Sequence, residues 1–312
     1  MGQNRKQHFI PQCYLRLFSE DGKHICTYDK IRSTSYRASI SDVCTINDFY
    51  TISNSYVSEE NLPSELIIEK DFFADTYEPT YANWLNKIDK ACSEAVSSPS
   101  KKIDLNNSDK LEFAYLISIQ WFRLPLIREQ GERTFNELMP KVLRLFSQGL
   151  AKETNNPEMA NLNVTAEISD KAAYHAKSTF MNEELVNAYA KALSENIWTF
   201  RYCADGQFYT SDFPINVKPH VKNVCPFCEG LAQYGAELTF PVSKNCMIII
   251  WDKSYFSHMK QDDCTVEYAS IKDIGHFNIQ RYAFTKRHLF SCNGNFGFID
   301  QMHKQRPIEF SL

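Results

Sequence analysis

Three stretches of the chain carry histidine, arginine and carboxylate side chains that together could act on a phosphate ester. The first is residues 7–18, where His8 stands three residues before Pro11. Proline suits the first turn of a helix, because its missing N–H would have no partner there. The positive end of that helix disfavours a second positive charge, so we expect a neutral imidazole that can accept a proton or bind a metal. The structural alternative is a histidine that only hydrogen-bonds and fixes the entry of the chain.

The second stretch contains Arg123, with Gln120 three residues before it. Residues 113–127 are apolar on nearly all sides of a predicted helix over 110–133, which indicates a buried helix. A guanidinium in such a helix is costly unless it meets a carboxylate, a phosphate or a substrate anion. Arg123 therefore either locks the core through an ion pair or serves a partly open site. The carboxylates that could form the structural pair are Glu65, Glu69 and Asp212.

The third stretch places Ser211 and Asp212 at the end of a strand. Residues 197–203 and 207–210 alternate as strands on either side of Asp205-Gly206, which predicts a hairpin. The Ser-Asp pair then lies where the sheet gives way to a loop. Asp212 is either a catalytic carboxylate or a turn-forming residue that satisfies its own backbone.

Two further groups of residues could bind a metal. Glu65 and Glu69 are four positions apart, so on a helix they share one face and could hold a divalent cation or share a proton. Cys225 and Cys228 have the spacing of a metal or redox pair, with His220 as a third ligand five residues upstream of Cys225. The alternatives are a solvated pair of surface carboxylates and an incidental loop, so the cofactor stays open, with a divalent metal as one option.

The composition is that of a globular protein with no strong charge. The chain has 312 residues, of which 43% are hydrophobic and 23% charged, and a net charge of −4. Only ten glycines are present, and the phosphate-binding and nucleophile motifs built on glycine are missing. The longest apolar run, Cys246 to Trp251, is far shorter than the roughly 20 residues of a membrane span. We expect a cytoplasmic protein whose ten cysteines are mostly reduced thiols.

The order of the predicted elements indicates an α+β fold in one compact domain over 1–312. Short strands and a first helix occupy residues 1–60, helices occupy 61–195, and a mostly antiparallel sheet with one late helix occupies 196–312. Strands are expected at 25–29, 36–40 and 49–52 in the first part. Pro125 should kink the central helix just after Arg123.

Several signatures together resemble the bacterial domain-of-unknown-function 4238 family. They are His8-Phe-Ile-Pro11 with Tyr14-Leu15, Gln120-Trp-Phe-Arg123-Leu-Pro125, Ser211-Asp212-Phe-Pro214, Phe240-Pro241-Val-Ser and Asn278. The resemblance covers nearly the whole chain. It implies no activity, cofactor or catalytic residue, and the Cys225 and Cys228 pair is not part of the pattern.

Two functional hypotheses follow from these residues. In the first, the protein is a hydrolase that acts on RNA, DNA or a nucleotide as a cellular effector. His8 is then the general acid or base, Asp212 orients it and Arg123 stabilises the charge on the phosphate, with Gln120, Ser211 and Glu69 in the same site. In the second, the same residues form a buried polar network in a scaffold that recognises a protein or nucleic-acid partner. A site that opens onto a pocket favours the enzyme, and an enclosed, mutually paired one favours the scaffold.

Overall fold

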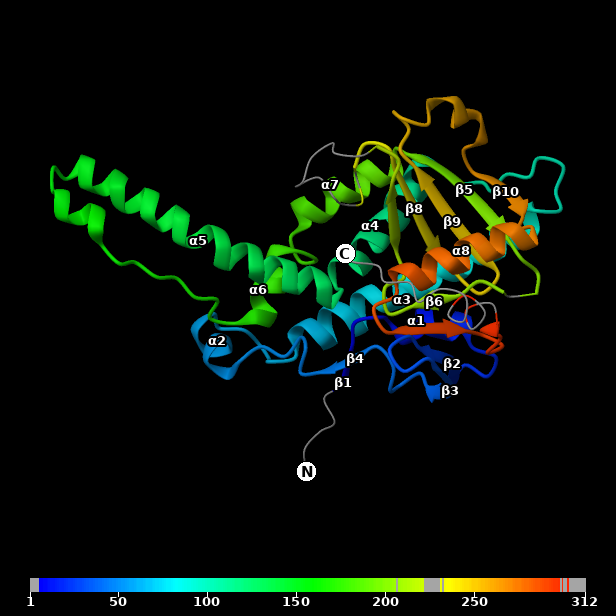
Figure 1. Ribbon diagram of the computed structural model, residues 1–312, viewed down its shortest axis with the longest axis horizontal. Coiled ribbons are helices and arrows are strands. Elements are labelled where there is room, and N and C mark those ends of the chain that lie inside the picture. Colours follow the sequence, from blue (N-terminus) through cyan, green and yellow to red (C-terminus); the bar gives the residue numbers. More distant parts are fainter. Residues whose placement is uncertain are drawn as a thin grey trace.

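The computed structural model describes residues 6–205, 207–221, 231, 233–297, 299 and 302. Strands lie at both ends of this chain with helices between them, which confirms the α+β prediction (Figure 1). The strands are β1 (Lys6–His8), β2 (His24–Asp29), β3 (Thr34–Ser39), β4 (Thr45–Asn47), β5 (Ile197–Tyr202), β6 (Thr210–Ser211), β7 (Asn216–Pro219), β8 (Ala236–Pro241), β9 (Cys246–Trp251), β10 (Thr265–Tyr268) and β11 (His288–Ser291). The α-helices are α1 (Gln12–Leu15), α2 (Asn54–Glu59), α3 (Glu78–Ala95), α4 (Asn107–Phe122), α5 (Pro125–Glu153), α6 (Lys171–Ser178), α7 (Glu183–Ser194) and α8 (Ile271–Phe284). A ten-residue π-helix, η2 (Ile68–Tyr77), precedes α3, and short 3-10 helices η1 (Arg16–Phe18), η3 (Pro157–Asn161) and η4 (Ser257–Asp262) complete the set.

The larger sheet has five strands in the order β10-β5-β9-β8-β7. All its pairs are antiparallel except β10 with β5. Strand β9 is apolar at consecutive positions because both of its faces are covered. Ile248 and Ile250 belong to the main core, while Met247 and Ile249 pack in a second cluster with Phe277 of α8. The sheet therefore lies between the central helices and α8, which crosses it in Figure 1.

The smaller sheet joins the two ends of the described chain. Its order is β3-β2-β11-β6, and Cys26 of β2 pairs with Ser291 of β11. A short third sheet pairs β1 with β4, which places His8 opposite Thr45. An N-terminal strand, β2, thus lies beside a C-terminal one, β11.

Two expectations about local structure are wrong. Strand β5 pairs with β9 and β10, while β6 pairs with β11, so the two strands around Asp205 do not form a hairpin; Gly206 lies outside the described residues. The third N-terminal strand is β4, and residues 49–52 are not a strand. At the predicted hairpin, partners distant in sequence replaced the local pairing that the turn signal favoured.

The central helix is two helices and not one kinked helix. Helix α4 ends at Phe122, Arg123 caps its C-terminus, Leu124 is extended, and Pro125 begins α5. This follows from the restriction that proline places on the residue before it, which is pushed out of the helical region. Helix α5 then leads away from the body as a long arm, and η3 returns along its far end (Figure 1).

No helix in the described part of the chain combines the length and apolar character that a membrane span requires. The eight cysteines in that part are all free thiols. Cys225 and Cys228 lie outside the described residues.

Candidate functional site

Arg123 is fully buried at the junction of α4 and α5. Its guanidinium donates to the backbone carbonyl oxygen of His8 and lies 3.4 Å from Oε1 of Glu78 through both terminal nitrogens. The plane of Phe73 lies beneath it, with 3.9 Å between the guanidinium carbon and the ring centroid. The expected partners Glu65, Glu69 and Asp212 are not the ones that form the ion pair. Glu78, the first residue of α3, forms it.

Glu69 lies near Arg123 on the π-helix η2, but its carboxyl group is not part of that ion pair. Its Oε2 atom is buried and has no hydrogen-bond partner among the described residues. Burial raises the pKa of Glu69 to about 7; the charge of Arg123 opposes this shift and that of Glu78 adds to it. Glu69 therefore changes its protonation state near neutral pH. π-Helical segments occur often at functional sites, where they re-aim side chains.

His8 ends strand β1 and is 8% exposed. Its Nε2 atom lies 3.1 Å from the backbone carbonyl oxygen of Ile40. A carbonyl oxygen only accepts, so Nε2 carries the hydrogen and Nδ1 keeps a lone pair. Burial lowers the pKa of His8; the hydrogen bond to Ile40 and the charge of Glu78 oppose this shift, and the charges of Arg123 and Arg16 add to it. The prediction of a neutral imidazole agrees with this environment, although the group that orients the ring is Ile40 and not Asp212.

Gln120 completes a group around Arg123. Its Nε2 atom donates to the carbonyl oxygen of Phe9 over 3.3 Å, while its buried Oε1 atom has no partner in the described part of the chain. The Nε atom of Arg123 is also buried and has no hydrogen-bond partner in that part. Buried polar atoms are nearly always paired, so unpaired ones gathered in one place mark a site that deserves a functional test. We call this group the Arg123 cluster; its members are His8, Glu69, Glu78, Gln120 and Arg123.

Ser211 and Asp212 form other contacts. The Asp212 carboxylate accepts three backbone N–H groups, from Lys286, Arg287 and His288, at 2.7 to 3.0 Å. The Ser211 hydroxyl donates to the carbonyl of Phe213 and accepts the amide N–H of the same residue. These bonds fix the turns that lead into and out of the smaller sheet. Asp212 therefore binds the backbone of a distant segment and not, as the turn-forming alternative expected, its own, and neither side chain hydrogen-bonds to the Arg123 cluster.

The predicted metal ligands are not assembled in the described part of the chain. Glu65 precedes η2 in a turn, so it does not share a helical face with Glu69. His220 binds Glu237, with 2.7 Å between Nε2 and Oε2. Within the described ranges, no three His, Cys, Asp or Glu side chains are arranged to hold a metal ion.

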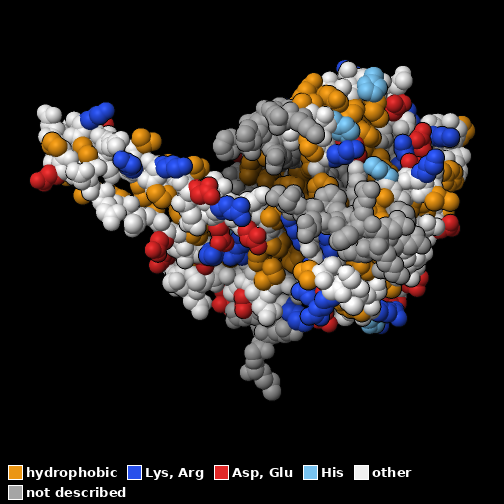
Figure 2. Space-filling view, viewed as in Figure 1, with side chains coloured by type: hydrophobic (Ala, Val, Ile, Leu, Met, Phe, Trp, Pro, Cys, Tyr) orange, Lys and Arg blue, Asp and Glu red, His pale blue; other side chains and the backbone are white. Residues whose placement is uncertain are grey.

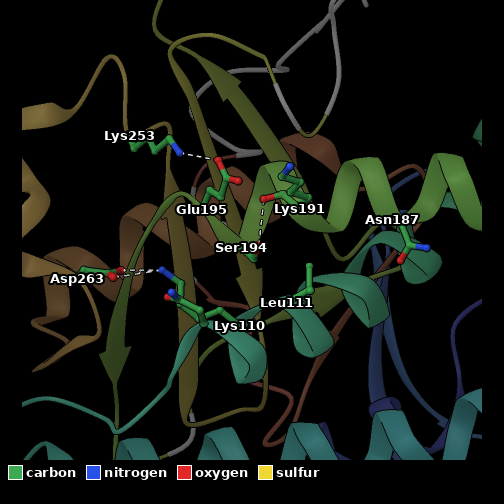
Figure 3. A pocket seen from close by; sticks show the side chains of 9 residues that line it. Lys110, Leu111, Asn187, Lys191, Ser194, Glu195, Lys253 and Asp263 are labelled. Atoms are coloured by element: carbon green, nitrogen blue, oxygen red, sulfur yellow. Dashed lines mark hydrogen bonds and ion pairs between the residues drawn. The ribbon is translucent and has the colours of Figure 1, made fainter.

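A separate pocket of about 660 Å³ lies between the start of α4 and the end of α7 (Figure 3). Lys110 faces Asp263 across it, at 3.1 Å, and Lys253 faces Glu195 at 2.6 Å. Asn107, Leu111, Asn187, Lys191 and Ser194 line the rest. Because most of its charges already form ion pairs, this pocket offers less chemistry than the Arg123 cluster. None of the residues predicted for the site lines it.

The comparison with known families agrees with the resemblance seen in the sequence. The model of a family described as "Protein of unknown function (DUF4238)" matches residues 6–295. This chain belongs to the DUF4238 family. No curated protein and no solved structure matches it.

The DUF4238 signatures fall into two groups in this structure. His8, Gln120 and Arg123 belong to the Arg123 cluster. The others join distant segments of the core: Tyr14 donates to the carbonyl of Pro241 over 2.8 Å and lies 2.6 Å from the hydroxyl of Thr210. This second group therefore stabilises the fold, and only the first remains a candidate for chemistry.

Among the buried charges of this DUF4238 protein that sequence reasoning missed, Arg281 is the one with no exposed surface. Arg281 of α8 is fully buried and donates to the carbonyls of Phe213, Pro214 and Thr239 and to the side chain of Asn216. Burial lowers its pKa to about 10. The signal was present, because Ile274 and Phe277 precede it at helical spacing on a buried face.

Proposed function

We propose that the Arg123 cluster is the active site of a hydrolase that acts on a phosphate ester, with a nucleic acid or a nucleotide as the substrate class and a role as a cellular effector. One observation carries this proposal. A neutral imidazole, His8, and a carboxyl group that is half protonated near pH 7, Glu69, both lie near the same buried Arg123. Enzymes use such pairs for proton transfer, because the two environments set the pKa values so that one group is a base and the other an acid at neutral pH.

The two groups take complementary roles in the reaction. Nδ1 of His8 accepts a proton from water while the water oxygen forms a bond to phosphorus. Protonated Glu69 gives its proton to the leaving oxygen as the old P–O bond breaks. Arg123 is a positioning residue, because it has no exposed surface and its terminal nitrogens already bind His8 and Glu78. Arg16, which lies on the surface close enough to lower the pKa of His8, supplies the positive charge that meets the substrate.

The test is hydrolysis by the purified full chain. Labelled RNA, DNA and a set of nucleotides are offered with magnesium, with manganese and with a chelator. We expect at least one substrate to be cleaved, and Glu69→Gln and His8→Gln each to lose at least about 100-fold in rate. The glutamine at position 8 keeps an N–H donor for Ile40. Asp75→Asn, an exposed change on the same π-helix, should keep full activity. No cleavage of any substrate, or full activity in both variants, would contradict the proposal.

A second function is supported by the enclosure and pairing of Arg123, which has no exposed surface and binds His8 and Glu78, because an enclosed, mutually paired group favours the scaffold. Arg123, Asp212 and Arg281 all bind backbone groups of distant segments, as expected of a polar network that locks a scaffold. In that case the function is recognition of a protein or nucleic-acid partner by the surface. Glu69→Gln and His8→Gln would then change stability and leave partner binding unaffected.

A further inference from the structure

The arm formed by α5 carries an apolar seam with the spacing of a coiled coil. Apolar or small residues recur at alternating steps of four and three positions, which places them on one side of the helix. They are Gly131, Phe135, Leu138, Val142, Leu145 and Gly149. The chain covers the seam in the first half of the helix and leaves it exposed in the second half, which is where a partner is needed.

The first half of the seam is covered by the chain itself. Tyr174 of α6 lies against it: its ring centroid is 5.6 Å from that of Phe135, and its hydroxyl donates to the carbonyl of Gly131 over 3.5 Å. The second half is bare. Leu138 is 51% exposed, Val142 53% and Leu145 68%, while Ser147 on the opposite side is buried.

Phe146 extends the bare half, with 64% of its surface exposed. Four large apolar side chains are therefore in contact with solvent on an element that projects from the body, and Figure 2 shows apolar side chains along this arm. Soluble proteins rarely leave a continuous apolar stripe of this kind uncovered, and such stripes mark interaction sites. Tyr174, which covers the first half, belongs to the helix α6, so the bare half is suited to a helix as well.

We infer that the bare half of the seam binds the same segment of a second copy of this chain, with the two arms antiparallel. The two flanks of the seam support this orientation. Met139 and Phe146 lie on one flank, and Lys141 and Gln148 on the other. Antiparallel helices place like flanks together, so the apolar flank meets itself, whereas parallel helices would place Phe146 against the lysine flank.

A single register fits the bare half without displacing α6. Val142 of each copy lies opposite Leu145 of the other, and Leu138 lies opposite Gly149. The space around Gly149 is open, since a Cβ atom there would meet nothing within 4 Å. In this register Glu137 comes within a turn of Lys152 of the second copy, so the charges are complementary about a twofold axis. The contact is about 24 Å long, which places the dimer among small, reversible interfaces.

The experiment measures the mass of the full chain by analytical ultracentrifugation from low micromolar to several hundred micromolar concentration. We expect a reversible monomer–dimer equilibrium. Leu145→Glu should raise the dissociation constant at least tenfold, whereas Arg144→Glu, the same new charge on the polar face, should change it less than threefold. Circular dichroism at a concentration where the parent is monomeric should report an unchanged melting temperature for both, because each side chain is exposed in the monomer.

The register is tested by exchanging charges. Glu137→Lys and Lys152→Glu should each weaken the dimer, and the double variant should return to within about threefold of the parent. A protein that stays monomeric at every concentration would overturn the inference. So would a dimer that Leu145→Glu does not weaken, or one that the double variant does not restore. The inference is independent of the Arg123 cluster, so hydrolysis by a monomer would leave the proposed function intact.

Discussion

Arg123 donates a hydrogen bond to the backbone carbonyl of His8, and this contact ties the end of α4 to the first strand of the described chain. The imidazole of His8 is thereby held near the carboxylate of Glu78, the first residue of α3. Any chemistry at this place depends on the ion pair between Arg123 and Glu78, in which the arginine side chain has no exposed surface. Three predictions concern the Arg123 cluster, a fourth concerns Asp212, and a fifth concerns the division of the chain into domains.

The first prediction concerns stability and the protonation of Glu69. Its pKa of about 7 in the folded protein exceeds the 4.5 of the free side chain. Between these values the folded state binds more protons than the unfolded chain, so the contribution of Glu69 to the free energy of unfolding falls as pH rises through this window. Glu69→Gln should therefore be more stable than the parent at pH 8, by up to roughly 3 kcal/mol, and gain little at pH 4. Urea denaturation at both pH values measures the difference; an equal effect at both would contradict the buried carboxyl group.

The second prediction concerns the rate of hydrolysis. Glu69 must be protonated to act as an acid, so the rate should fall as pH rises above about 7. His8 must be neutral to act as a base, and burial lowers its pKa, so the rate should hold down to pH values below the ordinary pKa of histidine. A rate profile from pH 5 to 9 checks both limbs. A rate that keeps rising to pH 9 would rule out Glu69 as the acid.

The third prediction concerns the ion pair of Arg123. Arg123→Ala should cost roughly 3 to 5 kcal/mol of unfolding free energy, because it removes the partner of Glu78 and the bond to the backbone of His8. Combining Arg123→Met with Glu78→Gln should recover a large part of this loss, since no charge is then left unpaired. Denaturant titrations of the single and double variants make the comparison. A double variant less stable than Arg123→Ala would argue against the pair as described.

The fourth prediction assigns Asp212 to the fold. Asparagine cannot accept the three N–H groups of Lys286, Arg287 and His288 as a carboxylate does. Asp212→Asn should therefore cost about 1 to 3 kcal/mol, while the exposed Asp75→Asn should cost less than about 0.5 kcal/mol. Thermal unfolding of both variants provides the test. Loss of hydrolysis with unchanged stability would instead return Asp212 to the active site.

The fifth prediction concerns the domain. Strand β2 has β3 and β11 as neighbours, so a fragment that ends at residue 195 lacks half of the smaller sheet and all of the larger one. We expect such a fragment to be unfolded by itself and the full chain to unfold in one transition. Circular dichroism of the fragment measures this. A stable, cooperatively folded fragment would show two domains.

The sequence revealed the burial of Arg123 but not its partner. A run of apolar residues on every side of a helix requires an interior position, whichever helices surround it. Which carboxylate reaches the guanidinium depends on how α3 packs against α4, and Glu78, next to Pro79, gave no periodic signal. The same limit explains the hairpin. A turn signal at Asp205 is local, whereas the partners of β5 and β6 are chosen by packing between strands far apart in the sequence.

The pairing of β2 with β11 has a consequence for synthesis on the ribosome. Cys26 of β2 and Ser291 of β11, which lie opposite each other, are 265 positions apart along the chain. The hairpin of β2 and β3 is synthesised early. The edge of β2 that pairs with β11 then stays unpaired until nearly the whole described chain has been translated. Closing so long a loop is slow, and an open strand edge attracts other chains. Nascent protein thus passes through a long period in which chaperones have a surface to recognise.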